Sequence, residues 1–420
     1  MSGVAVPKGR PYEMLVLGRR NHASGPKMTL GPSGVSRETG FAYEVLALDD
    51  LETAAWRSLN RTAISPSPFV DPVFLRGLSA VDPGQTPRLL VVWDPEDKAP
   101  LKAVWPFITR RLPSPQLQVV ETYTTQYSPL SVPLIAEDSP WRAVKTALEA
   151  FGEIAPVLTL PTLPLDSGFT GILADVMAQD AMPNRVTARG RRAALRGGSM
   201  FKDYAASNWT RSRRNKMQRM CRRLEAEGDV VFRTCSLYPG KDHVDEAFLA
   251  LEAKGWKGRA GTAMARTAEE RALVRIVVNE LIPAGLSEMH QLLIDGRPIA
   301  MLITHRLNGH NWAWKIAYDE DYARFSPGGL LFAEVTRKFL ARGDVFADSC
   351  ASDTPSLADS YWHEKLHYGT MHVALGGGAS KFAMHVSAAS NAAFDNARNL
   401  YRALRRQAPG LASAIRTTGE

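Results

Sequence analysis

The chain has 420 residues, which predicts two domains of about 150–200 residues, because single hydrophobic cores stop growing near roughly 250–300 residues. Hydrophobic residues make up 45% and charged residues 22% of the chain, which excludes a disordered protein and a fibre. The net charge of +8 favours partners that carry phosphate: nucleic acid, anionic lipid or a phosphorylated cofactor.

The sequence shows no signal for membrane insertion or for a cysteine framework. No apolar run approaches the roughly 18–20 residues that span a bilayer, and residues 1–30 lack the apolar core of a secretory signal. The three cysteines, Cys221, Cys235 and Cys350, lie far apart without a CxxC pair. We therefore expect a cytoplasmic protein without disulfides and without a bound metal.

The first half of the chain predicts a small α/β domain over residues 41–190, after a poorly ordered leader at 1–40. Its expected elements are a strand at 43–46, helices at 49–60 and from 73, a hairpin of strands at 88–93 and 101–109, a helix at 141–152 and a strand at 157–160. The Arg- and Gly-rich stretch 182–200 is expected to be irregular and to mark the domain boundary.

The second half predicts another α/β domain over residues 200–385, followed by a basic helical tail at 387–420. Its expected helices cover 207–227, 243–254, 268–281 and 328–341, with a further helix near Trp362. Its expected strands cover 229–235, 288–294, 299–307, 311–318 and 345–349, with a hairpin turn at Asn308-Gly309.

An internal parallel indicates a duplicated fold. Residues 89–112 and 290–307 both read as strand, acidic turn with proline, and strand, and they end in Thr-Arg-Arg-Leu and Thr-His-Arg-Leu. Each is followed by a Ser-Pro element, Ser128-Pro129 in the first half and Ser326-Pro327 in the second. Two parallels in the same order favour two copies of one domain.

The most informative segment is 318–331, where a strand ends, an acidic loop turns and a helix opens at Gly328-Gly329. The first amides of a helix are unpaired, the helix dipole favours negative charge there, and glycine lets a phosphate approach the backbone. The alternative is a tight turn that needs glycine for its dihedral angles.

This segment resembles the pyrophosphate loop of the GNAT superfamily of acyl-CoA-dependent N-acetyltransferases, Arg/Gln-x-x-Gly-x-Gly/Ala. Here the loop reads Arg324-Phe325-Ser326-Pro327-Gly328-Gly329, so Arg324 and Gly329 match, whereas Pro327 replaces the first glycine and removes one N–H donor.

Residues 43–376 resemble, within that superfamily, the CelD/BcsL-like acetyltransferases, which are linked to bacterial exopolysaccharide and cellulose synthesis and are related to the FemAB peptidyltransferases. The residues that carry the resemblance are Leu251-Glu252-Ala253-Lys254-Gly255-Trp256-Lys257-Gly258 with Gly261-Thr262-Ala263, Lys315-Ile316-Ala317-Tyr318-Asp319 with Ser326-Pro327-Gly328, Arg222-Arg223-Leu224-Glu225, and Asp348-Ser349.

The resemblance implies an α/β fold of two tandem GNAT-like domains with mixed, splayed sheets flanked by helices. The C-terminal copy would bind acetyl-CoA, the acyl donor, through Arg324, Ser326, Gly328, Gly329 and Leu330. The first copy has no such glycine junction and would shape an acceptor groove between the domains. The implied activity is direct acyl transfer to an amine on a saccharide or a lipid-linked precursor, since no cysteine or serine lies in a nucleophile motif.

Three residues are candidates for proton transfer. Glu252 could accept the proton of the acceptor amine, or it could simply pair with Lys254, Lys257 or Arg259. Tyr318, at a strand end, could protonate the leaving thiolate, as tyrosine does in many GNAT enzymes, or belong to the core. Asp348 could orient the substrate or act as the alternative base, or cap the turn that follows it.

Five residues are candidates for substrate binding: Trp256, Lys257, Lys315, Trp362 and His363. For Trp256 and His363 the alternative is ordinary packing or solvation, and for Lys257 an ion pair with Glu252. Trp256, Lys257 and Lys315 lie at the end of an expected helix or strand. Trp362 and His363 lie on the helix expected near Trp362, and His363 is a further acid/base candidate.

A basic helix lies at 211–223, with seven cations in thirteen residues and no acidic residue. The cations cover more than one helical face, so they cannot form a single stripe. Because only Trp209 is near for base stacking, we disfavour nucleic acid as a partner and favour attraction to the inner face of the membrane or to a glycolipid. A plain solvated helix is the alternative.

Two other functions remain open from the sequence. One keeps the fold but changes the donor to an aminoacyl-tRNA, as in the FemAB enzymes. The other is a non-catalytic GNAT-like partner of a polysaccharide synthase complex, which the imperfect phosphate loop keeps open.

Overall fold

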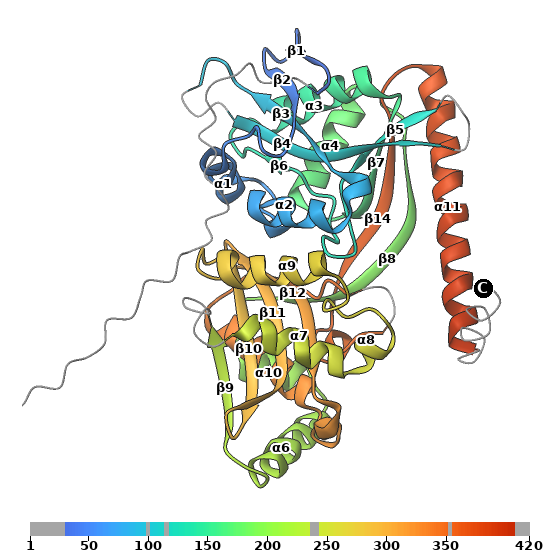
Figure 1. Ribbon diagram of the computed structural model, residues 1–420. Helices are drawn as coiled ribbons and strands as arrows, with labels where there is room; N and C mark the ends of the chain where they lie inside the picture. Colours follow the sequence, from blue (N-terminus) through green and yellow to red (C-terminus); the bar gives the residue numbers. More distant parts are fainter. Residues whose placement is uncertain (1–29, 98–100, 113–116, 236–242, 352–354, 408–420) are drawn as a thin grey trace, which may run out of the picture.

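Strands from both halves of the chain join one mixed sheet (Figure 1). The computed structural model describes residues 30–97, 101–112, 117–235, 243–351 and 355–407. The strands follow the order β1-β2-β3-β4-β5-β7-β14-β8-β13-β12-β11-β10-β9, and β6 pairs with β4. Helices flank this sheet, so the predicted α/β class is confirmed.

Among its described residues, the first half contributes eight strands and four α-helices. Its strands are β1 (Ser33–Val35), β2 (Ala42–Leu46), β3 (Arg88–Trp93), β4 (Leu101–Arg111), β5 (Gln118–Thr122), β6 (Leu134–Ile135), β7 (Val157–Pro164) and β8 (Asn184–Arg196). Its helices are α1 (Thr53–Thr62), α2 (Pro72–Val81), α3 (Pro140–Ile154) and α4 (Gly168–Gln179), with 3-10 turns η1 (Pro68–Val70) and η2 (Pro83–Gln85).

The second half contributes the remaining described elements. Its strands are β9 (Val230–Cys235), β10 (Ser287–Ile294), β11 (Arg297–Leu307), β12 (His310–Tyr318), β13 (Phe346–Asp348) and β14 (Glu364–Ala374). Its helices are α5 (Phe201–Asn208), α6 (Arg211–Glu225), α7 (Val244–Lys254), α8 (Trp256–Arg259), α9 (Ala268–Ile276), the π-helix η4 (Val277–Leu281), η5 (Glu320–Phe325), α10 (Pro327–Ala341), η6 (Ala358–Ser360) and α11 (Gly378–Gln407).

Local turn chemistry explains why the hairpins were predictable. The β11–β12 hairpin closes at Asn308 and Gly309, whose φ angles are 49° and 74°. The β10–β11 hairpin closes in the same way at Asp295 and Gly296, with φ of 49° and 76°. Two successive positive φ angles suit Asn-Gly and Asp-Gly and match the twist of the flanking strands. Both hairpins are confirmed.

Two long strands tie the halves together, and here the sequence reading needs correction. The stretch 182–200 is not irregular, because it contains β8, which pairs with β14 along most of its length and with β13 at its end. No α-helix forms near Trp362, where the three-residue 3-10 helix η6 leads into β14. Strand β14 lies between β7 and β8 and so completes the sheet of the first half (Figure 1).

The ends of the chain also differ in part from expectation. Residues 33–35 of the predicted leader form β1, which pairs with β2, whereas 1–29 lie outside the described residues. The basic tail is helical from Gly378 to Gln407 as α11, and 408–420 lie outside the described residues. The predicted division into 41–190 and 200–385 stays a prediction, because the exchange of β14 crosses it.

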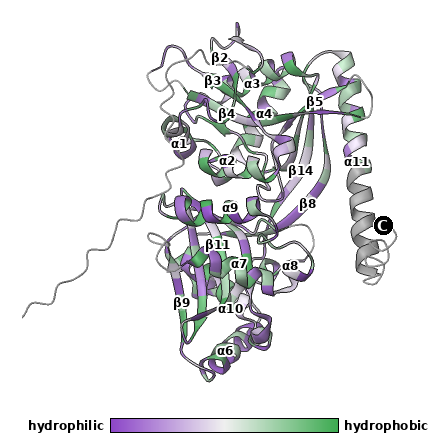
Figure 2. Ribbon diagram, viewed as in Figure 1, coloured by the Kyte–Doolittle hydropathy of each residue, from purple (hydrophilic) through white to green (hydrophobic). Residues whose placement is uncertain are grey.

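The main hydrophobic core cluster spans both halves, beside two smaller clusters. Phe69 and Phe74 of the first half meet His305 at ring-centroid distances of 5.4 and 5.3 Å, and Phe74 meets Trp314 at 5.8 Å. Edge-to-face contacts at these separations stabilise beyond their buried area. Figure 2 shows hydrophobic residues concentrated on the strands and their covering helices, whereas α6 is mostly hydrophilic. The shared core fixes the two halves relative to each other.

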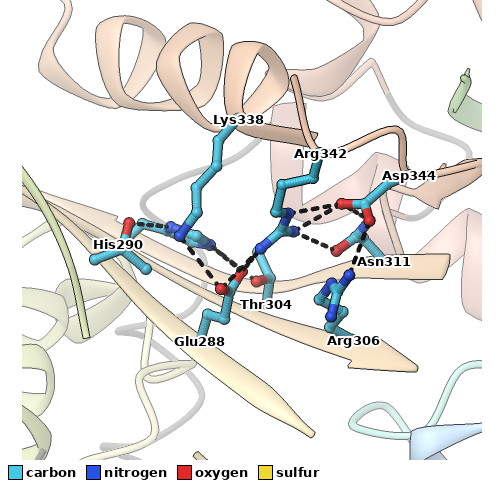
Figure 3. Close-up of polar contacts among 9 residues, drawn as sticks. Glu288, His290, Thr304, Arg306, Asn311, Lys338, Arg342 and Asp344 are labelled. Atoms are coloured by element: carbon cyan, nitrogen blue, oxygen red, sulfur yellow. Dashed lines mark hydrogen bonds and ion pairs between the residues drawn. The ribbon is translucent and has the colours of Figure 1, made fainter. Parts of the chain in front are cut away.

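A buried polar network fastens the C-terminal end of α10 to the sheet (Figure 3). Arg342 donates to both oxygens of Glu288 at 2.8 Å, to Asn311 at 3.2 Å and to Asp344 at 3.0 Å. Lys338 also donates to Glu288, at 3.2 Å. The arginine therefore connects α10 with β10 and β12, and it holds the helix whose other end forms the site described below.

Three buried histidines should make stability depend on pH. Burial lowers the pKa of His290 and His305 to about 3 and that of His372 to about 4, from an ordinary value of 6.5. Between pH 6.5 and 5 the unfolded chain binds protons that the folded chain excludes, so the free energy of unfolding falls as the pH falls. At pH 5 each histidine lowers the free energy of unfolding by roughly 2 kcal/mol relative to its value above pH 6.5. Urea unfolding at pH 8, 7, 6 and 5 measures this, with exposed His363→Gln as control; a flat profile would contradict it.

Candidate active site

The sheet separates between β12 and β13. Their parallel pairing covers only His310, Asn311 and Trp312 of β12. Beyond that point β12 continues to Tyr318 bonded to β11, and no described strand pairs with its other edge. A gap therefore opens beside the last residues of β12, as the predicted splayed sheet requires.

A cavity of about 520 Å³ lies at this gap, a volume typical of ligand sites. It is bounded by the end of β12, the start of α10, the α7–α8 junction and the segment that precedes η6. Its lining residues are Leu251, Glu252, Gly255, Trp256, Lys257, Ile316, Ala317, Tyr318, Ala323, Ser326, Pro327, Gly328, Gly329, Pro355, Ser356 and Leu357. The structure thus brings together residues predicted from separate motifs.

The start of α10 offers fewer free amides than the sequence suggested. The amides of Gly329 and Leu330 both donate to the carbonyl of Ser326, at 2.9 and 3.0 Å. Pro327 has no N–H, and the structure records no described acceptor for the amide of Gly328. Of the two glycine amides, that of Gly329 is bonded and that of Gly328 has no described acceptor. Gly328 and the N-terminal end of this 15-residue helix, with its dipole, lie at the cavity.

A side chain would have different effects at the two glycines. A Cβ at Gly328 would make an ordinary 3.5 Å contact with the Tyr318 ring, so only the cavity would be changed. A Cβ at Gly329 would lie 2.4 Å from the hydroxyl of Tyr361 and 2.8 Å from that of Ser326. Ser326 itself has φ of 53°, a left-handed conformation that costs free energy and often marks a functional turn.

Glu252 lies in the cavity wall with both carboxylate oxygens bonded. Oε1 accepts from Lys257 Nζ at 2.8 Å and Oε2 accepts from the amide of Met264 at 2.8 Å. Lys257 also donates to the carbonyl of Ile316 at 2.7 Å, a group on the separated part of β12. The ion pair that the sequence left open as the alternative for Glu252 is present, and Lys257 supports the open strand.

Tyr318 is the predicted acid whose surroundings suit its role. It is half-buried, it lines the cavity, and its ring packs beside Gly328. No described residue hydrogen-bonds its hydroxyl. Trp256 also lines the cavity and is 52% exposed at its rim, near Leu357, which is 37% exposed.

Lys315 lies on β12 toward the first half of the chain. Its ammonium is 4.5 Å from the ring centre of Tyr127 and 5.8 Å from that of Trp314. Burial, with the nearby charge of Lys257, lowers its pKa to about 8. Lys315 does not line the donor cavity but lies beside it, two residues before Ala317, which does.

Asp348 is held in a buried ion pair, and its predicted role as base or orienting group stays a prediction. Its two oxygens accept from Arg192 Nε and Nη2, both at 2.6 Å, and the side chains of both residues are almost completely buried. Oδ1 also accepts from the amide of Cys350. A carboxylate held in this way joins β13 to β8, and it does not line the cavity.

Four other predicted residues lie away from the cavity. Arg324 is 61% exposed and pairs with Glu227 at 3.2 Å. Leu330 is buried in the core with its amide already bonded. Trp362 is fully buried and donates to Thr336 at 2.9 Å, while His363 is exposed. In the helix that was expected here, the side chains of Trp362 and His363 would point in other directions.

One sequence motif was not considered in the prediction. His363-Glu364-Lys365-Leu366-His367 has the letters of the zinc motif HExxH, which needs a helix to bring both histidines to one metal. Here the segment enters strand β14, where residues four apart are roughly 13 Å apart. Among the described residues, no group of three or more metal-ligating side chains is gathered.

Other residues of the site were not foreseen. Arg192, the partner of Asp348, is one of several arginines in β8, and nothing in the sequence distinguishes it. Ser356 and Leu357 reach the cavity from a segment without periodicity. Only their position after Asp348, at a strand end, could have suggested them.

Comparisons with known proteins agree with this geometry. Residues 211–355 match the family described as acetyltransferase (GNAT) domain. The crystal structure of FemX matches with a TM-score of 0.52 at 9% identity, over 77% of this chain and 96% of that chain. The C-terminal domain assigned to a lysylphosphatidylglycerol synthetase from Agrobacterium fabrum reaches a TM-score of 0.49 at 12% identity, over 80% and 95%.

A tandem GNAT protein from the clavulanic acid biosynthesis pathway is also similar, with a TM-score of 0.38 at 13% identity over 80% of this chain and 99% of that one. No curated protein sequence matches the chain significantly. Among the described residues, no helix is long and apolar enough to cross a membrane. The GNAT match thus covers residues 211–355, the part of the chain that contains β12, the start of α10 and β13.

The Arg192–Asp348 pair should matter for stability more than for chemistry. Asp348→Asn leaves a buried guanidinium without its counter-charge, and we expect a loss of about 3–5 kcal/mol in the free energy of unfolding. Urea unfolding measures it, with Asp166→Asn as control, because Asp166 pairs with Arg196 at the surface. Unchanged stability together with lost turnover would instead restore Asp348 as a catalytic group.

Proposed function

We propose that this protein transfers an acyl group from acyl-CoA, with acetyl-CoA as the donor, to an amine. One observation carries the proposal: a cavity of about 520 Å³ lies where β12 leaves β13 and where α10 begins at Gly328. A helix start attracts the diphosphate of CoA, and the gap in the sheet gives its thioester arm a path along β12. The GNAT match of residues 211–355 includes both elements.

The proposed reaction is direct attack of the amine nitrogen on the thioester carbonyl. The C–N bond forms and the C–S bond breaks. The amine nitrogen must lose a proton, and the leaving thiolate must gain one. Tyr318 can protonate the thiolate, because the residue lines the cavity and its hydroxyl has no hydrogen-bond partner among the described residues. Glu252 can receive the amine proton through water, since each of its bonded oxygens retains a second lone pair.

The acceptor class comes from the resemblance alone: an amine on a saccharide or on its lipid-linked precursor, in exopolysaccharide or cellulose synthesis. Helix α6 supports a lipid-linked form. Leu224 is its one buried side chain among the described residues, so most of its cations face solvent. Arg213 lies 5.7 Å from the ring of Tyr361 and Arg223 lies 5.7 Å from that of Phe325, which places this charge beside the start of α10. Peripheral contact with an anionic membrane would bring such a precursor to the site.

Donor binding gives the first test. Titration calorimetry should show binding of acetyl-CoA and of CoA to the wild-type protein. We expect Gly328→Ala to weaken that binding at least tenfold without lowering the melting temperature, because its methyl group enters the cavity and makes only ordinary contacts, with Tyr318 at 3.5 Å and with Ile316 and Leu357 at 3.8 Å. Gly329→Ala is the matched variant: it should lower the melting temperature, because its methyl group would collide with Tyr361.

Absence of heat with any acyl-CoA in the wild-type protein would contradict the proposal and favour a non-catalytic partner. If instead an aminoacyl-tRNA were the donor, activity would be sensitive to ribonuclease while CoA would not bind.

Turnover gives the second test. Thiol release from acetyl-CoA, with glucosamine as the amine probe, should fall about 10²–10⁴-fold in kcat for Tyr318→Phe while the Kd for acetyl-CoA stays unchanged. Glu252→Gln should also lower kcat by about 10²-fold or more. The control is Glu269→Gln, an exposed position on α9. Wild-type kcat in Tyr318→Phe would remove the tyrosine from the mechanism.

A further inference from the structure

A largely buried lysine lies where the two halves meet next to the donor cavity. Lys315 on β12 is covered by the ring of Tyr127, from the first half, at 4.5 Å. The indole N–H of Trp314 donates to the carbonyl of Tyr127 at 2.9 Å and fixes that loop against β12. Lys315 as a residue is half-buried, so part of its side chain stays accessible.

The acidic groups around Lys315 are already compensated. Glu252 pairs with Lys257, and Asp348 pairs with Arg192. Glu270 on α9 pairs with Arg266 at 2.8 Å and accepts from the Tyr127 hydroxyl at 2.6 Å. Burial raises the pKa of the Cys350 thiol, which is therefore neutral.

No described carboxylate is therefore left to compensate the positive charge of Lys315. The structure records no ion pair between Lys315 and any described carboxylate, so the junction holds one uncompensated positive charge. Burial and the neighbouring Lys257 lower the pKa of Lys315 to about 8, so the ammonium still predominates at pH 7. An unpaired charge in a desolvated place is unfavourable unless a ligand supplies the counter-charge.

A second, independent feature lies at the same junction. Oε2 of Glu270 is buried and has no hydrogen-bond partner among the described residues. Tyr127 connects this carboxylate with Lys315, because its ring lies 4.5 Å from the ammonium and its hydroxyl donates to Glu270 Oε1 at 2.6 Å. An unpartnered acceptor oxygen and an unpaired ammonium together suit a ligand that carries an anionic group and a hydrogen-bond donor.

We propose that Lys315, Tyr127 and Glu270 form an acceptor subsite that binds the carboxylate of a carboxylate-bearing amine, such as an amino sugar acid. The inference rests on the proposed function, because it names the acceptor class for that reaction. A single positive charge matches a carboxylate monoanion better than a phosphate dianion. The carboxylate accepts from Lys315 Nζ, and Glu270 Oε2 accepts from a hydroxyl or amine of the same ligand.

The position of the subsite fits an acceptor. Lys315 and Ala317 lie on the same face of β12, roughly 7 Å apart along the strand, and Ala317 lines the donor cavity. The Glu252–Lys257 pair borders that cavity and acts electrostatically on Lys315. An amine anchored through a carboxylate at Lys315 therefore approaches the end of the donor cavity from the side of the first half.

Binding of three matched sugars tests the proposal without a donor. Glucosamine, 2-amino-2-deoxyglucuronic acid and glucosamine 6-phosphate differ only in the group at C6: hydroxymethyl, carboxylate and phosphate. In calorimetry at pH 7 we expect the wild-type protein to bind the uronic acid at least tenfold more tightly than the other two. Lys315→Met should abolish the difference and Lys315→Arg should retain part of it. Above pH 8 the preference should weaken as Lys315 loses its proton.

Stability separates this role from a structural one. Because the charge of Lys315 is uncompensated, Lys315→Met should keep or raise the melting temperature, whereas a large fall would show that the lysine holds the fold. Lys381→Met, at an exposed position on α11, is the control for both measurements. Equal affinity for the three sugars, preference for the phosphate, no binding of any of them, or an unchanged preference in Lys315→Met would each overturn the proposal. Since no acetyl-CoA is present, failure of donor binding is seen separately.

Discussion

The site depends on the separation of β12 from β13 after Trp312. Opposing attachments keep the two strands apart. The Arg192–Asp348 pair fixes β13 to β8, while Lys257 donates to the Ile316 carbonyl and satisfies a group that a neighbouring strand would otherwise bond. Because a buried carbonyl without a partner is unfavourable, this lysine lets the strand edge stay open. The gap is therefore part of the folded structure and does not require a ligand to form.

The surroundings of the gap are rigid for a related reason. The halves share one hydrophobic core and exchange β14, so the first half cannot move as an independent lobe without breaking the sheet. Helix α10 is fixed at its far end through Arg342 and Glu288, and at its near end by the packing of Tyr361 against Gly329. A preorganised site of this kind avoids the entropic cost of ordering its parts when a ligand binds.

What could be predicted from the sequence was local. Gly328-Gly329 and Asn308-Gly309 signal a helix start and a hairpin through backbone geometry that neighbouring residues determine. The roles of Asp348 and Trp362 could not be predicted, because their partners, Arg192 and Thr336, lie 156 and 26 residues away in the chain. The irregular stretch expected at 182–200 is β8 for the same reason: its pairing with the distant β14 overrides the weak local preference of its arginines and glycine.

Pro327 shows how the two parts of the site complement each other. With proline at the first helical position and Gly329 bonded to Ser326, one glycine amide without a described acceptor and the helix dipole remain for the diphosphate of the proposed donor. Donor affinity then has to come also from the apolar wall, where Trp256 and Leu357 are exposed at the rim. The acceptor subsite that we propose uses the opposite principle, a single desolvated charge at Lys315. It contacts less of the ligand surface but discriminates more sharply, because a neutral acceptor would leave that charge unpaired. In the proposed reaction, the donor is thus bound through a broad contact area, whereas the acceptor is selected by its charge.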